Sequence, residues 1–200
     1  MAKIKIAVAG CLGRMGQELS KQIINNNKLE FVGGFEYKKH KDINKQFKEV
    51  SDINSTKLID SHPTNSIKTA NVIIDFTTPQ STLENVKIAS QNKTAVIIGT
   101  TGMTEAQKKK VKSYAKKIPI LMSSNMSLGV NILFKLVSEA AAAFGDDVDY
   151  EIMEAHHSRK IDAPSGTAAR LGEILANNLS RDVKSCGVYG RQGNVGERHK

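Results

Sequence analysis

Short apolar runs alternate with amphipathic stretches along the first 125 residues of the chain. The apolar runs are typical of buried strands and lie at residues 3–9, 29–35, 57–59, 71–76, 95–98 and 118–122. Between them, apolar residues recur at helical spacing at residues 17–26 and 104–117, and Pro79 occupies a favoured first-turn position of a further helix. Five or six strands that alternate with helices predict an α/β fold with a doubly wound parallel sheet.

The pattern changes near residue 126, and a long helix is predicted at residues 128–144. Its apolar stripe is typical of a face that packs on a sheet and consists of Leu128, Ile132, Leu133, Leu136, Val137 and Ala140. Beyond it we predict only two strands, at residues 148–154 and 185–189, and a helix at residues 167–176. Because two strands cover little surface, we expect this stripe and the strand edges to be exposed in a smaller α+β domain.

A glycine-rich turn stands between the first strand and the first helix. Its glycines follow a G-x-x-G-x-x-G spacing at Gly10, Gly13 and Gly16, with Leu12 where the general dinucleotide-binding motif has its second glycine. The first glycine permits a tight turn, the second lets a pyrophosphate approach the helix, and the third allows close helix packing. Glu36 follows 20 residues after Gly16, where an acidic residue binds the ribose of NAD. The segment predicts a Rossmann-like dinucleotide-binding domain.

A polar cluster with two adjacent histidines occupies residues 154–169, EAHHSRKIDAPSGTAA. It lies between a predicted strand and a predicted helix, where α/β proteins display their chemistry. Ser165 is suited to cap that helix, and Gly166 lets a carboxylate or phosphate approach its backbone N–H groups. A histidine supplies a proton near neutral pH, and Lys160 adds fixed positive charge. The cluster predicts a pocket that holds an acidic substrate and protonates it.

This string resembles the motif of the dihydrodipicolinate reductase (4-hydroxy-tetrahydrodipicolinate reductase) family, E-x-H-H-x-x-K-x-D-A-P-S-G-T-A. Every fixed position from Glu154 to Ala168 is matched. The glycine turn is similar to the family's G-x-x-G-R-M-G, residues 123–127 resemble A-A-N-F-S, and residues 191–198 resemble R-x-G-x-x-G-E-R. The resemblance implies NAD(P)H-dependent reduction of a small cyclic dicarboxylate, 4-hydroxy-tetrahydrodipicolinate, in the diaminopimelate–lysine pathway.

The resemblance also implies roles for individual residues. His156 is the expected general acid/base, Lys160 a second proton donor, and Asp162 a structural residue that orients the loop. Phe76 and Thr77 end a strand at the crevice where the nicotinamide lies in such folds. The expected substrate-binding residues are His157, Gly166 and Thr167. The expected cofactor-binding residues are Gly10, Cys11, Leu12, Gly13, Arg14, Met15, Glu36, Gly99, Thr100, Thr101, Ser123, Ser124, Asn125 and Met126.

By the same resemblance, residues 1–125 form the dinucleotide-binding domain and residues 126–200 part of a substrate-binding and oligomerisation domain. The cofactor is NADH or NADPH, because Glu36 suits a free ribose while Lys38 or Lys39 could bind a 2′-phosphate in place of the family's Arg. The family's chains continue with further strands, through which subunits form tetramers. We therefore expect this chain alone to bind dinucleotide with little turnover and no oligomer, and an inactive, truncated remnant stays an alternative.

Composition changes this picture little. The net charge of +9 is spread over lysines without interleaved aromatic side chains, so we expect no nucleic-acid partner, although the positive field favours anionic ligands. No apolar run reaches the roughly 18 residues of a membrane span, and the first residues enter a strand pattern without a signal peptide. Cys11 and Cys186 lack metal-ligand spacing. We predict a cytoplasmic protein with reduced cysteines, no membrane partner and no metal site.

Overall fold

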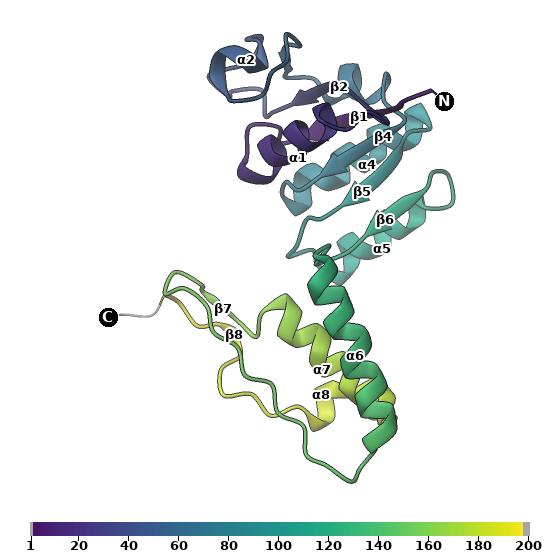
Figure 1. The fold of residues 1–200 in the computed structure, drawn as a ribbon, viewed down its shortest axis with the longest axis vertical. Coiled ribbons are helices and arrows are strands. Elements are labelled where there is room, and N and C mark those ends of the chain that lie inside the picture. The colour runs from purple at the N-terminus through teal and green to yellow at the C-terminus, as the bar shows by residue number, and fades with distance from the viewer. Residues whose placement is uncertain (1, 198–200) are drawn as a thin grey trace. The chain divides into compact units, whose positions relative to one another are not determined.

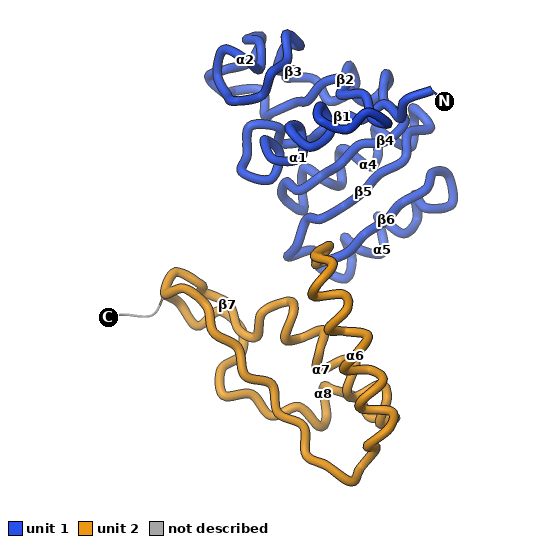
Figure 2. Tube along the Cα trace, in the orientation of Figure 1, with its two compact units in different colours: residues 1–123 blue, residues 124–200 orange. Residues whose placement is uncertain are grey.

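The computed structural model describes residues 2–197 and divides into two compact units, Met1–Ser123 and Ser124–Lys200 (Figure 2). The sequence places the domain boundary slightly later, between residues 125 and 126. Arg198, the last residue of the R-x-G-x-x-G-E-R resemblance, lies outside the described residues. Among the helices of residues 2–197, none combines the length and the apolar character needed to cross a membrane.

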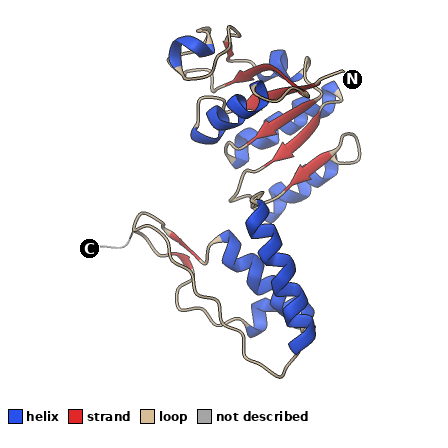
Figure 3. Ribbon diagram, in the orientation of Figure 1, coloured by secondary structure: helices blue, strands red, loops and turns tan. Residues whose placement is uncertain are grey.

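Six parallel strands form the sheet of unit 1, in the spatial order β3-β2-β1-β4-β5-β6 (Figure 1; Figure 3). The strands are β1 (Ile4–Ala9), β2 (Leu29–Phe35), β3 (Ile59–Asp60), β4 (Val72–Asp75), β5 (Ala95–Ile98) and β6 (Ile120–Met122). The helices are α1 (Arg14–Ile24), α2 (Phe47–Val50), α3 (Pro63–Ile67), α4 (Pro79–Asn92) and α5 (Glu105–Tyr114). The predicted doubly wound sheet is confirmed, the single turn α2 lies in the segment 37–54 where one helical turn was expected, and the short helix α3 was not predicted. The strand order reverses between β1 and β4, where such sheets bind ligands.

Alternate residues of β1 face opposite sides of the sheet and build two separate cores. Ile6 and Val8 pack with residues of α1 and α2, whereas Ala7 and Ala9 pack with residues of α3, α4 and α5. All four side chains are buried. Helices therefore cover both faces of the sheet, and this explains why the strands read as continuous apolar runs.

Unit 2 is built mainly from two helices. Its elements are α6 (Leu128–Phe144), β7 (Asp162–Ala163), α7 (Gly166–Asn178), α8 (Val183–Cys186) and β8 (Gly193–Asn194). The helices α6 and α7 lie side by side, and Asn178 Nδ2 donates a hydrogen bond to Ser138 Oγ at 3.0 Å. The strands β7 and β8 form a two-stranded antiparallel ladder. The helices predicted at residues 128–144 and 167–176 are confirmed.

Both strands predicted for unit 2 are wrong. Residues 148–154 form no strand. Alternating polar and apolar residues determine which side each side chain faces, but a strand also needs a neighbouring strand that pairs with its backbone N–H and C=O groups. Residues 185 and 186 belong to α8, and residues 187–189 have no regular structure. Asp182 begins this helix, since its side chain accepts a hydrogen bond from the Lys184 N–H. The ladder that does form joins β7 and β8, neither of which was predicted.

The apolar stripe of α6 is exposed except at Val137, largely as expected from the sequence. Leu128 is 77% exposed and Leu136 is 56% exposed. The half-buried Val137 lies on the less exposed face of the helix with Phe134 and the buried Ala141. Unit 2 therefore buries less of its apolar surface than the covered sheet of unit 1 does.

Candidate functional site

The loop between β1 and α1 has the geometry expected of a dinucleotide-binding turn. Gly10 has a φ of +63°, a conformation that favours glycine. A Cβ on Gly16 would lie 2.1 Å from the carbonyl oxygen of Gly10, so the loop and helix approach each other as only glycine permits. Gly13 begins α1 without a side-chain cap, and the first helical residues Arg14 and Met15 are exposed. The N-terminus of α1 is therefore suited to an anion such as a pyrophosphate.

Two side chains flank this loop in different ways. Glu36 follows β2, and its Oε1 accepts a hydrogen bond from the Leu12 N–H at 2.8 Å. Cys11 is completely buried, and burial, with the nearby Glu36 charge, raises the pKa of its thiol. A Cβ on Gly34 would lie 2.5 Å from Cys11 Cβ, so this side chain packs against β2. The structure thus brings together the glycine turn and the acidic residue assigned to the ribose, and packs the Cys11 side chain in the core, away from a ligand.

The carboxyl ends of β4 and β5 are joined by Asp75, a residue to which sequence reasoning gave no role. Asp75 is completely buried and accepts hydrogen bonds from the N–H and hydroxyl of Thr77 and from the hydroxyl of Thr100. The Gly99 N–H donates to its backbone oxygen at 2.8 Å, whereas Thr101 is exposed. The sequence did contain a signal for such a role, because an acidic residue stands within an apolar run that predicts a buried strand.

The segment assigned to the cofactor at residues 123–126 spans the boundary of the two units. In unit 1, the Ser123 N–H donates to the Ile98 carbonyl at 3.1 Å. In unit 2, Asn125 Oδ1 accepts from the Ser127 N–H at 2.9 Å, and Nδ2 donates to Thr167 Oγ1 at 3.3 Å. The two residues that flank Asn125 are exposed. The structure therefore brings Asn125, assigned to the cofactor, against Thr167, assigned to the substrate.

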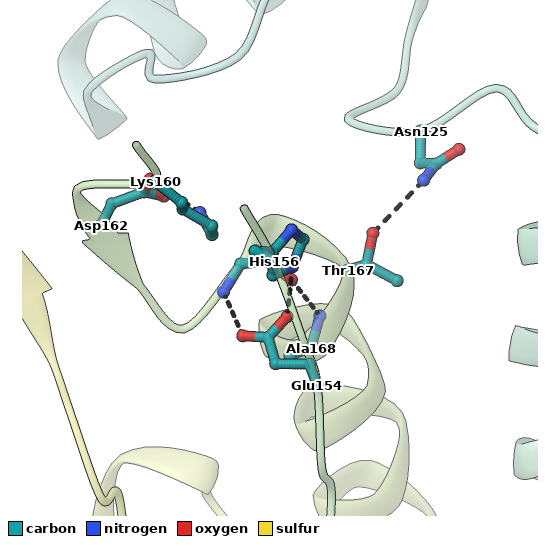
Figure 4. Close-up of polar contacts among 8 residues, drawn as sticks. Asn125, Glu154, His156, Lys160, Asp162, Thr167 and Ala168 are labelled. Carbon is teal, nitrogen blue, oxygen red and sulfur yellow. Dashed lines mark hydrogen bonds and ion pairs between the residues drawn. The ribbon is translucent and has the colours of Figure 1, made fainter. Parts of the chain in front are cut away.

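Glu154 organises the histidine-containing loop of unit 2 (Figure 4). Its Oε2 lies 2.9 Å from His156 Nε2, and its Oε1 accepts a hydrogen bond from the Ser165 N–H at 2.8 Å. Burial opposes the charged form, but the hydrogen bonds from Ser165 and His156 together lower the pKa of Glu154 to about 2. An ionised carboxylate therefore holds one ring nitrogen of His156 and fixes the orientation of the ring. Sequence reasoning assigned no role to Glu154, although the motif contains it.

Lys160 is held within the same loop. Its Nζ lies 2.7 Å from Asp162 Oδ1, and its side chain is only 18% exposed. The hydrogen bond from Lys160 is the main reason why the pKa of Asp162 is lowered from its ordinary value. Asp162 also begins β7, which pairs with β8 at Asn194. This placement agrees with the structural, loop-orienting role expected of Asp162.

The start of α7 presents open backbone N–H groups. Ser165 is the buried N-cap residue, and its hydroxyl accepts from the Ala168 N–H at 3.1 Å, as the sequence predicts. Open space lies where Gly166 lacks a side chain, and Thr167 is half-buried. The helix has 13 residues and no acidic residue in its first turn, so its N-terminus is suited to an anion. His157 is exposed, and no hydrogen bond of its ring is seen within residues 2–197.

One cavity of about 40 Å³ gathers the polar side chains of this loop. Glu154, His156, Lys160 and Arg191 are among the residues that line it. Arg191 begins the R-x-G-x-x-G-E-R resemblance, but sequence reasoning gave it no separate role. A guanidinium group pairs well with carboxylates. The cavity therefore combines the expected acid/base and second proton donor with a further cation.

Comparison with known proteins identifies relatives along the whole chain. The family model described as "Dihydrodipicolinate reductase, N-terminus" matches residues 4–126, and that described as "Dihydrodipicolinate reductase, C-terminus" matches residues 129–200. A 4-hydroxy-tetrahydrodipicolinate reductase of Syntrophobacter fumaroxidans is 40% identical over 196 residues, which are 98% of this chain and 73% of the relative. One of Colwellia psychrerythraea is 39% identical over 198 residues, which are 99% of this chain and 74% of the relative.

Solved structures agree with these relatives. The dipicolinate-bound dihydrodipicolinate reductase from Paenisporosarcina sp. TG-14 matches with a TM-score of 0.70 and 32% identity, and the match covers 88% of this chain and 67% of that chain. The scyllo-inositol dehydrogenase from Lactobacillus casei matches with a TM-score of 0.55 and 11% identity over 70% of this chain and 42% of that chain, a likeness of fold alone. From the two family models and the relatives, this chain belongs to the dihydrodipicolinate reductase family.

Proposed function

We propose that this chain catalyses the NAD(P)H-dependent reduction of 4-hydroxy-tetrahydrodipicolinate to tetrahydrodipicolinate, a step of the diaminopimelate–lysine pathway. Family membership and curated relatives that carry this enzyme's name support the reaction. The observation that carries the proposal is the Glu154–His156 pair, which lines one cavity with Lys160 and Arg191. Such a cavity is equipped to attract a dicarboxylate and to give it a proton.

The residues of unit 1 fit a nicotinamide dinucleotide. The uncapped N-terminus of α1 and the close approach at Gly16 leave the backbone accessible to a pyrophosphate. Glu36 lies against the same turn, where its carboxylate can bind a ribose hydroxyl. When bound, the nicotinamide supplies the hydride of the reaction. The residues proposed to hold it are those expected from the sequence, in the loops after β1, β2 and β5 and at residues 123–126.

The proton chemistry falls to the loop around His156. Reduction adds one hydride at C4 of the substrate ring and consumes one proton, and the 4-hydroxyl group leaves as water. His156, whose ring is oriented by Glu154, is the proposed general acid/base. Lys160, held by Asp162, is the proposed second proton donor and offsets negative charge on the substrate.

The start of α7 is the proposed anchor for one substrate carboxylate. Gly166 and Thr167 lie at its first turn, where backbone N–H groups point outward and the helix dipole favours an anion. The exposed His157 is the third residue proposed to contact the substrate. Together these groups would orient the ring so that its reacting atoms face the proton donor.

Cofactor preference and assembly form the finer part of the proposal. Glu36 supports NADH, because a carboxylate bonds a free 2′-hydroxyl and repels a 2′-phosphate. The exposed Lys38 and Lys39 supply the positive charge that NADPH needs, so both cofactors belong in the test. The family resemblance further supports a cytoplasmic enzyme and, in an assembled form, a homotetramer.

Turnover of this chain with each cofactor tests the reaction. Oxidation of NADH or NADPH is followed by absorbance, with and without 4-hydroxy-tetrahydrodipicolinate, and the product is identified by mass spectrometry. We expect substrate-dependent oxidation and formation of tetrahydrodipicolinate, at the low rate that the sequence leads us to expect of this chain alone. We expect Lys160→Ala to bind dinucleotide while losing most of this turnover. No substrate-dependent oxidation with either cofactor would contradict the proposal.

A further inference from the structure

Asp75 has no part in the proposed chemistry, yet it is completely buried at the end of β4. It is paired in register with Ala9 of β1 and with Ile98 of β5, so it lies at the point where the strand order reverses. The hydrogen bonds described for its carboxylate come from hydroxyl, amide and backbone donors, all of them neutral. Burial of a carboxylate without a cation is costly, and an apolar residue would fill a strand at lower cost. The position of Asp75 therefore points to a role beyond packing.

Five donors converge on this carboxylate from three segments of the chain. Its Oδ1 accepts from the N–H of Thr77 at 2.9 Å, and from the hydroxyls of Thr77, Thr82 and Thr100 at 2.6, 3.1 and 3.4 Å. Its Oδ2 accepts from Asn85 Nδ2 at 2.9 Å. Thr82 and Asn85 belong to α4, whereas Thr77 and Thr100 lie in the loops after β4 and β5. The carboxylate thus connects a buried helix face to two loops of the proposed cofactor site.

Both loops are also packed against glycines. A Cβ on Gly10 would lie 2.8 Å from Thr77 Cγ2, so the methyl group of Thr77 rests on the first glycine of the dinucleotide-binding turn. A Cβ on Gly99 would lie 2.1 Å from the ring of Phe76. These contacts leave no room for a side chain at either glycine. A displacement of Asp75 would therefore move the loops after β1, β4 and β5 together.

We propose that Asp75 is a positioning residue for the dinucleotide. It holds the loops after β1, β4 and β5 in the arrangement that binds pyrophosphate and nicotinamide, and it does so through Thr77 and Thr100 without touching the cofactor. This inference rests on the proposed function, because it needs a dinucleotide in those loops. Disturbing Asp75 then weakens cofactor binding and slows hydride transfer, since a misplacement of about 1 Å can cost about 10²-fold in rate. A residue that only stabilised the fold would change unfolding alone.

The test compares Asp75→Asn with Asn85→Leu in the intact chain. Asp75→Asn keeps the size of the side chain but turns one acceptor into a donor. Asn85→Leu removes the buried donor that α4 provides to Oδ2 and leaves the bonds of Thr77 and Thr100 to Oδ1 in place, whereas the Thr82 hydroxyl also lies 2.8 Å from Thr100 Oγ1 and is no clean control. The measurements are Kd for NADH by fluorescence titration, kcat at saturating NADH, and the midpoint of thermal unfolding. We expect Asp75→Asn to raise Kd and lower kcat by about tenfold each, and Asn85→Leu to lower the midpoint with Kd changed less than about twofold.

A second substitution tests whether the effect of Asp75→Asn can be reversed. Asp75→Asn combined with Asn85→Asp exchanges donor and acceptor between β4 and α4, and leaves an oxygen for Thr77 and Thr100. We expect this double variant to recover NADH affinity, and a folded double variant without recovery counts against the proposal. If Asp75→Asn does not fold, Thr77→Val removes only the loop-side hydroxyl and should weaken NADH binding.

The outcomes separate this inference from the proposed function. A folded Asp75→Asn protein with parental Kd and kcat overturns the positioning role while the parent's own turnover still supports the reaction. Equal loss of affinity in Asn85→Leu, or parental affinity in a folded Thr77→Val, overturns it as well. A parent chain that binds no dinucleotide overturns the proposed function and this inference together.

Discussion

The two units hold their candidate functional residues by contrasting means. In unit 1, the hydrogen bonds at the glycine turn and at the strand ends join positions far apart in the sequence. Leu12 and Glu36 are 24 positions apart, and Asp75 and Thr100 are 25 positions apart. These contacts exist only because the buried sheet brings β1, β2, β4 and β5 together. The geometry of the proposed cofactor site is therefore a property of the whole unit.

In unit 2, the side chains of the candidate catalytic loop are held by short-range contacts, although the β7–β8 ladder also joins its backbone to residues 193 and 194. Glu154 bonds His156 two positions away and Ser165 eleven positions away, and Lys160 bonds Asp162 two positions away. The loop is largely exposed, with only the N-cap residue Ser165 buried. From this difference we expect that the proposed proton chemistry of unit 2 can be removed without unfolding the chain, whereas the proposed dinucleotide binding of unit 1 depends on the buried core.

The largest effect is expected from removal of the proposed acid/base. His156→Ala should lower kcat by about 10²–10⁴-fold, because a positioned proton donor contributes that much, and should leave NADH affinity unchanged. Steady-state kinetics of oxidation and fluorescence titration of NADH measure the two quantities. The unfolding midpoint should also stay near that of the parent, since His156 lies in a largely exposed loop.

A matched histidine of unit 1 controls for the loss of an imidazole anywhere in the chain. His62 is exposed and precedes α3, and His62→Ala should keep parental kcat. Parental turnover in His156→Ala would remove this residue from the mechanism. A large loss of NADH affinity in His156→Ala would instead break the separation of tasks between the units.

The second effect concerns stability and compares one apolar residue from each unit. Ile73 in β4 is completely buried and Leu136 in α6 is 56% exposed. Ile73→Ala should lower the free energy of unfolding by about 2–5 kcal/mol, whereas Leu136→Ala should change it by less than about 0.5 kcal/mol. Urea unfolding followed by circular dichroism measures both. A cost at Leu136 as large as that at Ile73 would show that the α6 stripe is covered in solution.

How well the fold could be predicted differs between the units for the same reason. In unit 1 every strand except the two-residue β3 lies in an apolar run long enough to be recognised, and helices on both faces make that pattern unambiguous. In unit 2 the alternation at residues 148–154 predicted a strand that does not form, since the sequence cannot show whether a pairing strand exists. At residues 183–186 the cap provided by Asp182 outweighed the apolar pattern.

The candidate site shows the same division. His156 and Lys160 were recognisable from residue type, spacing and motif, and the structure places both at one cavity. The carboxylates that bond His156 and Lys160 could not be identified from the sequence, because hydrogen-bond partners depend on how the folded chain places its side chains. Glu154 was therefore recognised only as a position of the family motif, and Asp75 was not recognised as a site residue.

The third effect tests the long-range contact between the glycine turn and β2. Glu36→Ala should weaken NADH binding by about tenfold, because a hydrogen bond to a charged group contributes roughly 1.5–3 kcal/mol. NADPH should lose less affinity, since the carboxylate repels its 2′-phosphate. Fluorescence titrations with both cofactors measure the ratio.

Glu30, an exposed glutamate at the other end of β2, provides the matched control. Glu30→Ala removes the same charge from the same strand, so it reports any general effect of charge on dinucleotide affinity. We expect it to change neither affinity by more than about twofold. Equal losses of NADH and NADPH affinity in Glu36→Ala would place Glu36 away from the ribose.

The smallest effect is a pH dependence that belongs to unit 2. The pKa of Glu154 is lowered from its ordinary value of 4.5 to about 2, so the folded state binds this proton less readily than the unfolded state. Glu154 therefore contributes stability that is fully present above about pH 4.5 and lost as the pH falls toward about 2. The difference in unfolding free energy between the parent and Glu154→Gln should shrink across this window. Urea unfolding at a series of pH values measures it.

A neutral contact in the same unit sharpens this prediction. Asn178→Ala removes the hydrogen bond from Asn178 to Ser138 between α7 and α6, and this contact carries no titratable proton. Its cost in unfolding free energy, measured against the parent, should therefore stay constant over the same pH range. If the cost of Glu154→Gln were equally constant, the carboxylate would not be held by His156 and Ser165 in solution. The short-range support proposed for the catalytic loop would then be wrong, because an unheld Glu154 could not orient the His156 ring.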